Sequence, residues 1–105
     1  MPRFAVHVNE NPGSREEFPF LVDVQAELLE DLATRVVIPL GKAEDLGGFP
    51  MRYLIPRVAF QGRPYALLTP LLGGIRRDEL GPQAGSLADQ EPVISSAIDF
   101  LLRGF

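Results

Sequence analysis

Apolar residues alternate with other residues at the start of the chain. In the segment RFAVHVN every second residue is apolar: Phe4, Val6 and Val8. This period of two predicts a strand that buries one face. His7 falls on the other face, so we expect it to be an exposed strand residue.

Further along, segments rich in β-branched and aromatic residues are separated by glycine and proline. They predict strands over residues 18–24, 35–40, 53–60 and 63–69, and residues 70–75 could form one more short strand. The second of these ends near Pro39, and Pro56 interrupts the third. Gln61-Gly62 predicts a tight turn, so the strands on either side of it should form a hairpin.

Three segments rich in glycine and proline predict loops: residues 11–14, 41–50 and 81–86. Residues 25–33 fit two structures. Leu28, Leu29 and Leu32 have the spacing of a helical turn, and they fit equally well an ordered loop with exposed apolar residues.

The hydrophobic period changes near the end of the chain. Apolar residues recur there at the i, i+3, i+4 and i+7 spacing of a helix that buries one face: Ile94, Ala97, Ile98 and Leu101. The pattern predicts one helix over residues 90–102, capped at its start by Asp89 and ended by Gly104 in the left-handed conformation. Several short strands followed by one helix predict a single, mostly β domain of the α+β class over residues 1–105.

The composition excludes several kinds of functional site. The 105 residues contain no cysteine and one histidine, which excludes a thiolate metal site and leaves almost no ligands for zinc. We therefore expect neither a metal nor a cofactor. No apolar run approaches the ~20 residues of a membrane span, and the first residues lack the apolar stretch of a signal peptide. The prediction is a cytoplasmic protein without membrane contact.

The net charge of −4 is unevenly distributed along the chain. Residues 1–45 carry nine acids and four bases, and residues 78–105 carry five acids and one base. The stretch between them has no acid and five arginines: Arg52, Arg57, Arg63, Arg76 and Arg77. These arginines could form a face that binds an anionic ligand. We favour the alternative, in which they lie on the polar sides of strands and pair with acids folded over them.

Three segments resemble the CcdB family, the toxins of the Ccd type II toxin–antitoxin modules. The first is FLVDVQ at residues 20–25, and RVVIPL follows it at residues 35–40. The third is the ending AIDFLLRGF, where the family has a hydrophobic helix that closes on a glycine and one last apolar residue. Asn11-Pro12 and the strand pair around Pro56 and Gly62 also match, so the resemblance spans essentially the whole chain.

The resemblance implies an SH3-like barrel of antiparallel strands, with a small second sheet and a C-terminal helix. It implies a homodimer that is not an enzyme, binds the A subunit of DNA gyrase and traps the gyrase–DNA cleavage complex. A disordered CcdA-like antitoxin would neutralise the toxin, and DNA would be contacted only indirectly, through that antitoxin.

The resemblance also places the gyrase contacts. They fall on two apolar residues after the VDVQ strand and on the end of the helix: Leu28, Leu29, Asp99, Leu102, Arg103, Gly104 and Phe105. Three of these residues differ from the family's plasmid toxin. Asp99 replaces an amide, Leu102 replaces an aromatic residue and Arg103 replaces a tryptophan.

Two alternatives remain open. The first is a module of the same fold that binds an antitoxin as a repressor component but no longer poisons gyrase. Arg103 favours it, because an arginine repels the arginine on which a tryptophan would stack. The second is a ribonuclease of the related MazF type, for which the cluster Arg76-Arg77-Asp78-Glu79 supplies acid, base and arginine.

Overall fold

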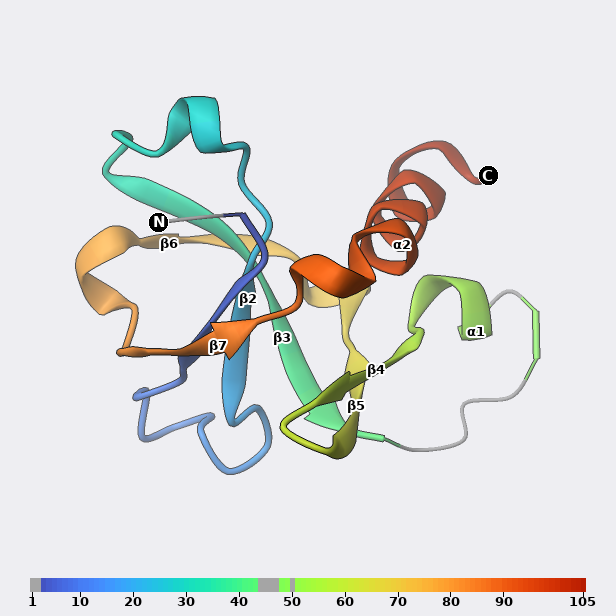
Figure 1. The fold of residues 1–105 in the computed structure, drawn as a ribbon, viewed down its shortest axis with the longest axis horizontal. Helices are drawn as coiled ribbons and strands as arrows, with labels where there is room; N and C mark the ends of the chain where they lie inside the picture. The colour runs from blue at the N-terminus through green and yellow to red at the C-terminus, as the bar shows by residue number, and fades with distance from the viewer. Residues whose placement is uncertain (1–2, 44–47, 50) are drawn as a thin grey trace.

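One curled antiparallel sheet and a C-terminal helix make up the protein (Figure 1). The computed structural model describes residues 3–43, 48–49 and 51–105. Within them the strands are β1 (Ala5–Val8), β2 (Phe20–Asp23), β3 (Thr34–Lys42), β4 (Arg57–Phe60), β5 (Arg63–Leu67), β6 (Gly73–Arg76) and β7 (Gln83–Ser86). The α-helices are α1 (Met51–Leu54) and α2 (Glu91–Arg103), and the 3-10 turns are η1 (Glu27–Leu29), η2 (Thr69–Leu71), η3 (Arg77–Glu79) and η4 (Ala88–Gln90).

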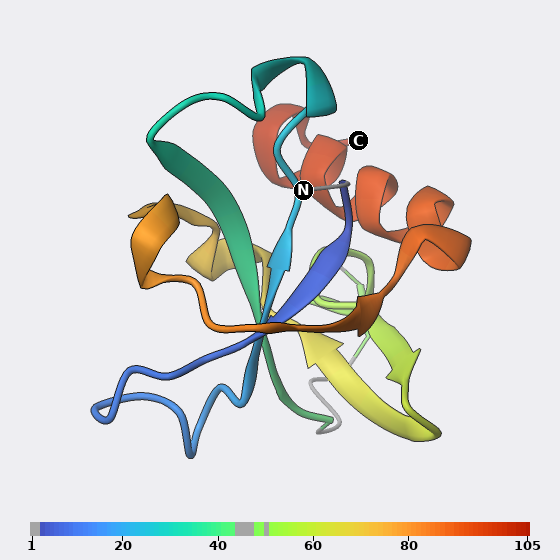
Figure 2. The same ribbon diagram turned by 60° about the vertical axis from the view of Figure 1, so that its left-hand side comes forward.

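The nine-residue strand β3 organises the sheet. The strands pair in the order β4-β5-β3-β2-β1-β7, and β6 pairs with β3 beside this path. One edge of β3 carries β2, while the other carries β6 and then β5. The sheet curls into a half-barrel (Figures 1 and 2), which confirms the expected fold class. The resemblance also implied a small second sheet. Among the described residues it is not separate, because strand β5 of the β4–β5 hairpin pairs with β3 of the main sheet.

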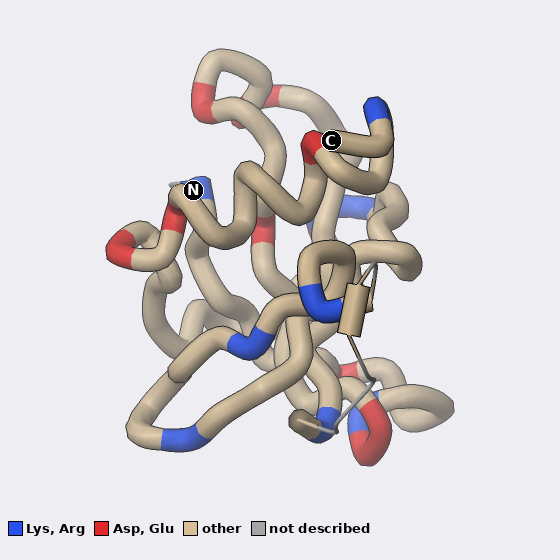
Figure 3. The backbone as a smooth tube through the Cα atoms, turned by 90° about the vertical axis from the view of Figure 1, so that its right-hand side faces the viewer, with Lys and Arg blue, Asp and Glu red and all other residues tan. Residues whose placement is uncertain are grey.

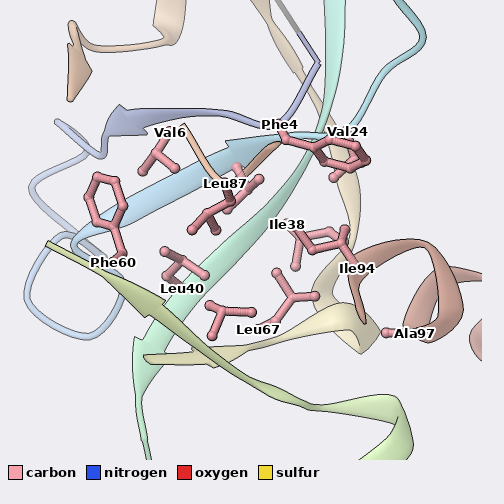
Figure 4. Packing of buried hydrophobic residues seen from close by; sticks show 12 residues of the cluster. Phe4, Val6, Val24, Ile38, Leu40, Phe60, Leu67, Leu87, Ile94 and Ala97 are labelled. Carbon is pink, nitrogen blue, oxygen red and sulfur yellow. The ribbon is translucent and has the colours of Figure 1, made fainter. Parts of the chain in front are cut away.

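The concave side of the sheet and one face of α2 enclose the core (Figure 4). The core residues come from nearly every strand, and α2 contributes Ile94 and Ala97. Phe20 packs edge-on against Phe60 with ring centroids 5.0 Å apart, and against Tyr65 at 5.7 Å. The contacts of Ile94 and Ala97 with this core fix the position of α2, and therefore of the end of the chain.

The predicted end of the third strand at Pro39 is wrong, because β3 continues to Lys42. Neighbouring strands explain how the proline is accommodated. The Pro39 carbonyl accepts a hydrogen bond from the Leu68 N–H at 3.0 Å, so the nitrogen of Pro39 faces the same edge. On that edge β6 pairs as far as Val37 and β5 begins at Leu40. The missing N–H therefore falls in the gap between two partner strands.

The expected exposure of His7 is also wrong. Strand β1 lies between β2 and β7, and both of its faces are covered, so His7 is buried. Its Nδ1 lies 3.0 Å from the Gly81 carbonyl oxygen. Because a carbonyl can only accept, Nδ1 carries the proton and donates this bond.

Two local predictions fail at segments of ambiguous composition. Residues 51–54 form the short helix α1, whereas a strand was predicted from residue 53, and the strand begins after Pro56, at Arg57. The predicted loop over residues 81–86 contains strand β7, which pairs with β1. Glycine is poor in strands, but here a Cβ at Gly85 would lie 2.7 Å from the Phe60 ring.

The turn and helix predictions come closer to the structure. Gln61 and Gly62 both have positive φ, 53° and 76°, and they form the tight turn between β4 and β5. Helix α2 is displaced by one residue from the predicted range. Asp89 does not cap it. The N-cap residue is Gln90, which makes no side-chain cap hydrogen bond and instead binds the backbone of Ala59.

Candidate functional site

The last turn of α2 exposes apolar residues to solvent. Ile94 and Ala97 anchor the first half of the helix in the core, whereas Leu102 is 71% exposed and Phe105 is 85% exposed. Figure 1 shows this end of α2 extending away from the sheet. Exposing large apolar side chains is unfavourable in water, so such a projecting cluster is typical of a surface that a partner covers.

Gly104 ends the helix as predicted. Its φ of +83° is left-handed, and its N–H donates to the Phe100 carbonyl at 2.9 Å. No atom lies within 4 Å of the place that a Cβ would occupy. The backbone conformation, and not crowding, is therefore the reason for glycine at this position. The turn determines the direction in which Phe105 leaves the helix.

Asp99 and Arg103 form an ion pair across one turn of α2. Arg103 Nη2 lies 3.3 Å from Asp99 Oδ1, and both side chains are at least half exposed. Two of the three positions that differ from the plasmid toxin of the resembled family are thus partners of each other. Asp99 compensates part of the positive charge of Arg103, so the end of the helix presents a neutral pair in addition to its apolar residues.

An aromatic groove adjoins this end of the helix. Phe49, Tyr53 and Phe100 lie with ring centroids 5.8 to 6.2 Å apart. Together with Gly104 and Phe105 they line an open hollow of about 370 Å³. The first three residues were not among the predicted contacts. Tyr53 falls in the predicted strand 53–60, whereas it lies on α1, which brings it to α2. Phe49 falls in the predicted loop 41–50, for which the sequence indicates no contact.

The other two predicted contacts lie on η1. Leu28 is 92% exposed and Leu29 is 46% exposed, and Leu32 beside them is also exposed. Both structures considered for this segment are present in part, since a single 3-10 turn lies within an otherwise irregular loop. No residue of η1 is buried, so η1 has no core anchor of its own.

Two groups of predicted contacts therefore occupy different elements. Both η1 and the end of α2 lie at the upper end of the molecule in Figures 1 and 2, and Figure 1 shows them apart from each other. Within the described residues, no hydrogen bond, ion pair or ring contact joins them. The structure brings Asp99, Leu102, Arg103, Gly104 and Phe105 together on one helix end, and it places Leu28 and Leu29 on a second, neighbouring projection.

A buried ion pair underlies the η1 side. Arg35 on β3 donates from Nε to Asp23 Oδ2 at 2.9 Å, and its Nη2 lies 2.7 Å from the same oxygen. Both side chains are completely buried. Such a pair is expensive to bury, and its removal on one side leaves an uncompensated charge. It fixes Asp23, the last residue of β2, just before the chain turns into η1.

The arrangement expected for the five arginines is found in part. Arg76 pairs with Asp78 and Glu79, which follow it in sequence, and Arg77 donates to the Glu30 carbonyl. Arg57 and Arg63 are exposed and make no ion pair among the residues that the structure describes. Basic residues of α1, β4 and β5 extend across one face of the molecule in Figure 3.

The candidate ribonuclease cluster on η3 is occupied by internal contacts. A hydrogen bond and the charge of Asp78 raise the pKa of Arg76 above its usual range, since both favour the charged guanidinium. Arg77 holds the η1 loop instead of facing Asp78. Over the described parts of the chain, no group of three or more His, Asp or Glu side chains could hold a metal ion. No described helix has the length and hydrophobicity that crossing a membrane requires.

Comparison with known protein families identifies the chain. The family model described as CcdB protein matches residues 3–104. The chain belongs to the CcdB family. The match includes both projections, η1 and the end of α2 as far as Gly104, and the resemblance of the VDVQ and VIPL segments is confirmed. Family membership supports the assignment of a CcdB-like toxin, and this family consists of gyrase-binding toxins and not of classical enzymes.

Proposed function

We propose that the protein is a homodimeric toxin that binds the A subunit of DNA gyrase, traps the gyrase–DNA cleavage complex, and is neutralised by a CcdA-like antitoxin. The family match over nearly the whole chain carries this proposal. The contact surface consists of the end of α2 and of η1, that is, of Leu28, Leu29, Asp99, Leu102, Arg103, Gly104 and Phe105.

The geometry of the helix end supports a role in binding. Leu102 is exposed on the last turn of α2, so its backbone is already ordered when a partner covers it, and Phe105 is exposed directly after the Gly104 cap. Large apolar residues at the centre of an interface usually contribute most of its binding free energy. In a homodimer, symmetry would present this cluster twice.

The Asp99–Arg103 ion pair affects how Arg103, which replaces the tryptophan of the family's plasmid toxin, would interact with the target. An isolated arginine would repel an arginine of the target, but the Asp99 carboxylate 3.3 Å away offsets part of that repulsion. The Arg103 side chain is 63% exposed in this ion pair. Arginine and aromatic residues can stack on a planar guanidinium, so Arg103 is accessible to such a residue of the target.

A DNA-cleavage assay with purified gyrase tests the proposal. We expect the protein to stabilise covalent gyrase–DNA complexes formed by gyrase of its own host, and to stop the growth of that host when expressed. A Phe105→Asp variant is the matched control, because it alters an exposed residue without affecting the core. Absence of both cleavage complexes and growth arrest with the unaltered protein would refute gyrase poisoning.

Arg103 favours a second function, that of an antitoxin-binding module without gyrase poisoning. This function predicts tight binding of a CcdA-like antitoxin together with undetectable binding of the gyrase A subunit. Titration of both partners by calorimetry separates the two proposals. Size-exclusion chromatography with light scattering measures the oligomeric state, for which we expect a dimer in both cases.

A further inference from the structure

Leu28 and Leu29 project into solvent from a turn that lacks apolar anchors. A 3-10 turn of three residues has few internal hydrogen bonds and is weakly stable alone. In η1 these are the bonds from the Leu29 N–H to the Ala26 carbonyl and from the Glu30 N–H to the Glu27 carbonyl. Another part of the molecule must therefore hold the turn in place.

Gln25 is the buried group that connects η1 to the sheet. Its side chain is almost completely buried. The Nε2 amide donates to the Leu29 carbonyl at 2.8 Å, and Oε1 accepts from the Val36 N–H of β3 at 3.0 Å. One side-chain amide thus bridges the middle strand of the sheet and the backbone of a predicted contact residue.

The buried ion pair fixes Gln25 in turn. The Gln25 backbone N–H donates to Asp23 Oδ1 at 3.0 Å, while the other carboxylate oxygen, Oδ2, accepts from Arg35 Nε at 2.9 Å. Each oxygen of Asp23 therefore has its own partner. The connected groups run from Arg35 through Asp23 and Gln25 to the Leu29 carbonyl. The side chains of Arg35, Asp23 and Gln25 are buried, whereas that of Leu29 is exposed.

Two further hydrogen bonds to this loop are exposed. Arg77 donates to the Glu30 carbonyl, and the Arg3 backbone N–H lies 3.3 Å from Glu27 Oε1. Exposed hydrogen bonds compete with water and contribute less than buried ones. The Gln25 side chain makes a less exposed hydrogen bond, to the carbonyl of Leu29. Leu29 is one of the two residues of η1 that are proposed to contact the target.

We propose that Gln25 is a positioning residue for target binding, which pre-orders η1 so that Leu28 and Leu29 are presented in one conformation. The inference rests on the proposed contact between η1 and the gyrase A subunit. A loop that is already ordered loses little conformational entropy on binding, whereas a loose loop must be ordered by the partner.

The chain contains a matched control for Gln25. Gln90 also uses both ends of its side-chain amide on the backbone: Oε1 accepts from the Ala59 N–H at 3.0 Å and Nε2 donates to the Ala59 carbonyl at 2.7 Å. It lies at the start of α2, at the opposite end of that helix from the proposed contacts. The substitutions Gln25→Met and Gln90→Met therefore each remove two side-chain hydrogen bonds to the backbone, in a buried place at Gln25 and in a more exposed one at Gln90.

The first experiment measures binding of the host gyrase A subunit together with amide hydrogen exchange. We expect Gln25→Met to weaken binding at least about tenfold and to increase exchange at Leu29, Glu30 and Leu32. Gln90→Met should leave both unchanged at a comparable melting temperature. Equal binding and equal loop protection in the two variants would overturn the inference.

A second variant covers the case in which Gln25→Met does not fold. Gln25→Glu keeps an acceptor for the Val36 N–H, but it can donate to the Leu29 carbonyl only when protonated. Burial at this position should raise the pKa of the introduced carboxyl group, so that it loses its proton between pH 5 and 8. The affinity of Gln25→Glu relative to the unaltered protein should therefore fall over this range, while Gln90→Glu gives a flat ratio. A flat ratio for Gln25→Glu would also contradict the proposal.

Different results would refute the proposed gyrase target and the proposed role of Gln25. If the unaltered protein does not bind the gyrase A subunit, the proposed target is wrong, and the hydrogen-exchange comparison still decides whether Gln25 orders η1. If the unaltered protein binds and Gln25→Met binds equally well, the target stands and the positioning role is wrong.

Discussion

The two projections at the upper end of the molecule are held in different ways. The end of α2 is the continuation of a helix whose first half is packed in the core, so its position follows from Ile94 and Ala97. The η1 turn has no buried residue of its own and depends on buried polar groups beneath it. One projection is thus supported by apolar packing and the other by hydrogen bonds and an ion pair.

The difference predicts different sensitivities to mutation. Apolar packing loses stability in proportion to the volume removed, so changes of the exposed apolar side chains at the end of α2 should affect binding and not folding. Removing one member of a buried polar network is strongly destabilising, because its partners remain desolvated without a hydrogen bond or counter-charge. We therefore expect mutations beneath η1 to lower both target affinity and stability. Mutations of the exposed apolar side chains of α2 should lower target affinity alone.

The largest effect should come from Asp23→Ala. It leaves the buried Arg35 guanidinium without a counter-charge, and we expect a loss of about 3–5 kcal/mol in the free energy of unfolding. Urea denaturation followed by circular dichroism measures it. The double variant Asp23→Leu/Arg35→Met removes both charges and should recover most of the loss. A single variant as stable as the unaltered protein would show that the η1 side does not depend on this pair.

Phe105→Ser should reduce binding of the gyrase A subunit by ~30-fold or more, equivalent to ~2 kcal/mol, if it is a central contact. Its melting temperature should not change, because the side chain is exposed. Val93→Ser is the control, since Val93 is an exposed apolar residue at the opposite end of α2. Similar binding by the two variants would remove the end of α2 from the interface.

Gly104→Ala should cost ~1 kcal/mol, because alanine is strained at a φ of +83°. Thermal unfolding measures this cost. Gly104→Asn should cost less, since asparagine tolerates the left-handed region. If the alanine and asparagine variants are equally stable, the helix ends in another conformation in solution.

The smallest effect should come from Asp99→Ala. Its exposed ion pair with Arg103 is worth only ~0.3–0.5 kcal/mol in stability, and salt should reduce this further. The affinity for the gyrase A subunit should show the effect of this substitution more clearly than stability does. If Asp99 offsets the charge of Arg103 toward the target, the affinity should fall in Asp99→Ala and recover when Arg103→Leu is added. No recovery would mean that the pair has no role in compensating this charge.

The sequence predicted most of the fold because most strands and α2 follow a local pattern of apolar residues. The core strands follow β-branched runs, and α2 follows its apolar spacing to within one residue. The failures occur where tertiary contacts override composition. β7 is a strand despite its glycine because β1 requires a partner there and Phe60 leaves no room for a Cβ at Gly85.

The candidate site was predictable only in part. Gly104 carries a local signal, and the exposed apolar residues follow from the family resemblance. The roles of Gln25 and Tyr53 could not be found in the same way. Gln25 acts through bonds to residues four and eleven positions away, and Tyr53 joins the site through a four-residue helix that periodicity cannot detect.

The exposed arginines of the β4–β5 hairpin have a consequence for association kinetics. The whole molecule is negative, with a net charge of −4, while the hairpin carries Arg57 and Arg63, which are exposed and make no ion pair with a described residue. At low ionic strength an approaching acidic partner experiences the net charge first and is repelled. Near physiological ionic strength the screening length is about 8 Å, so the distant charges are screened while the arginines at contact still attract. The association rate of an acidic partner at this hairpin should therefore rise when salt is first added, and fall again only when the contact itself is screened.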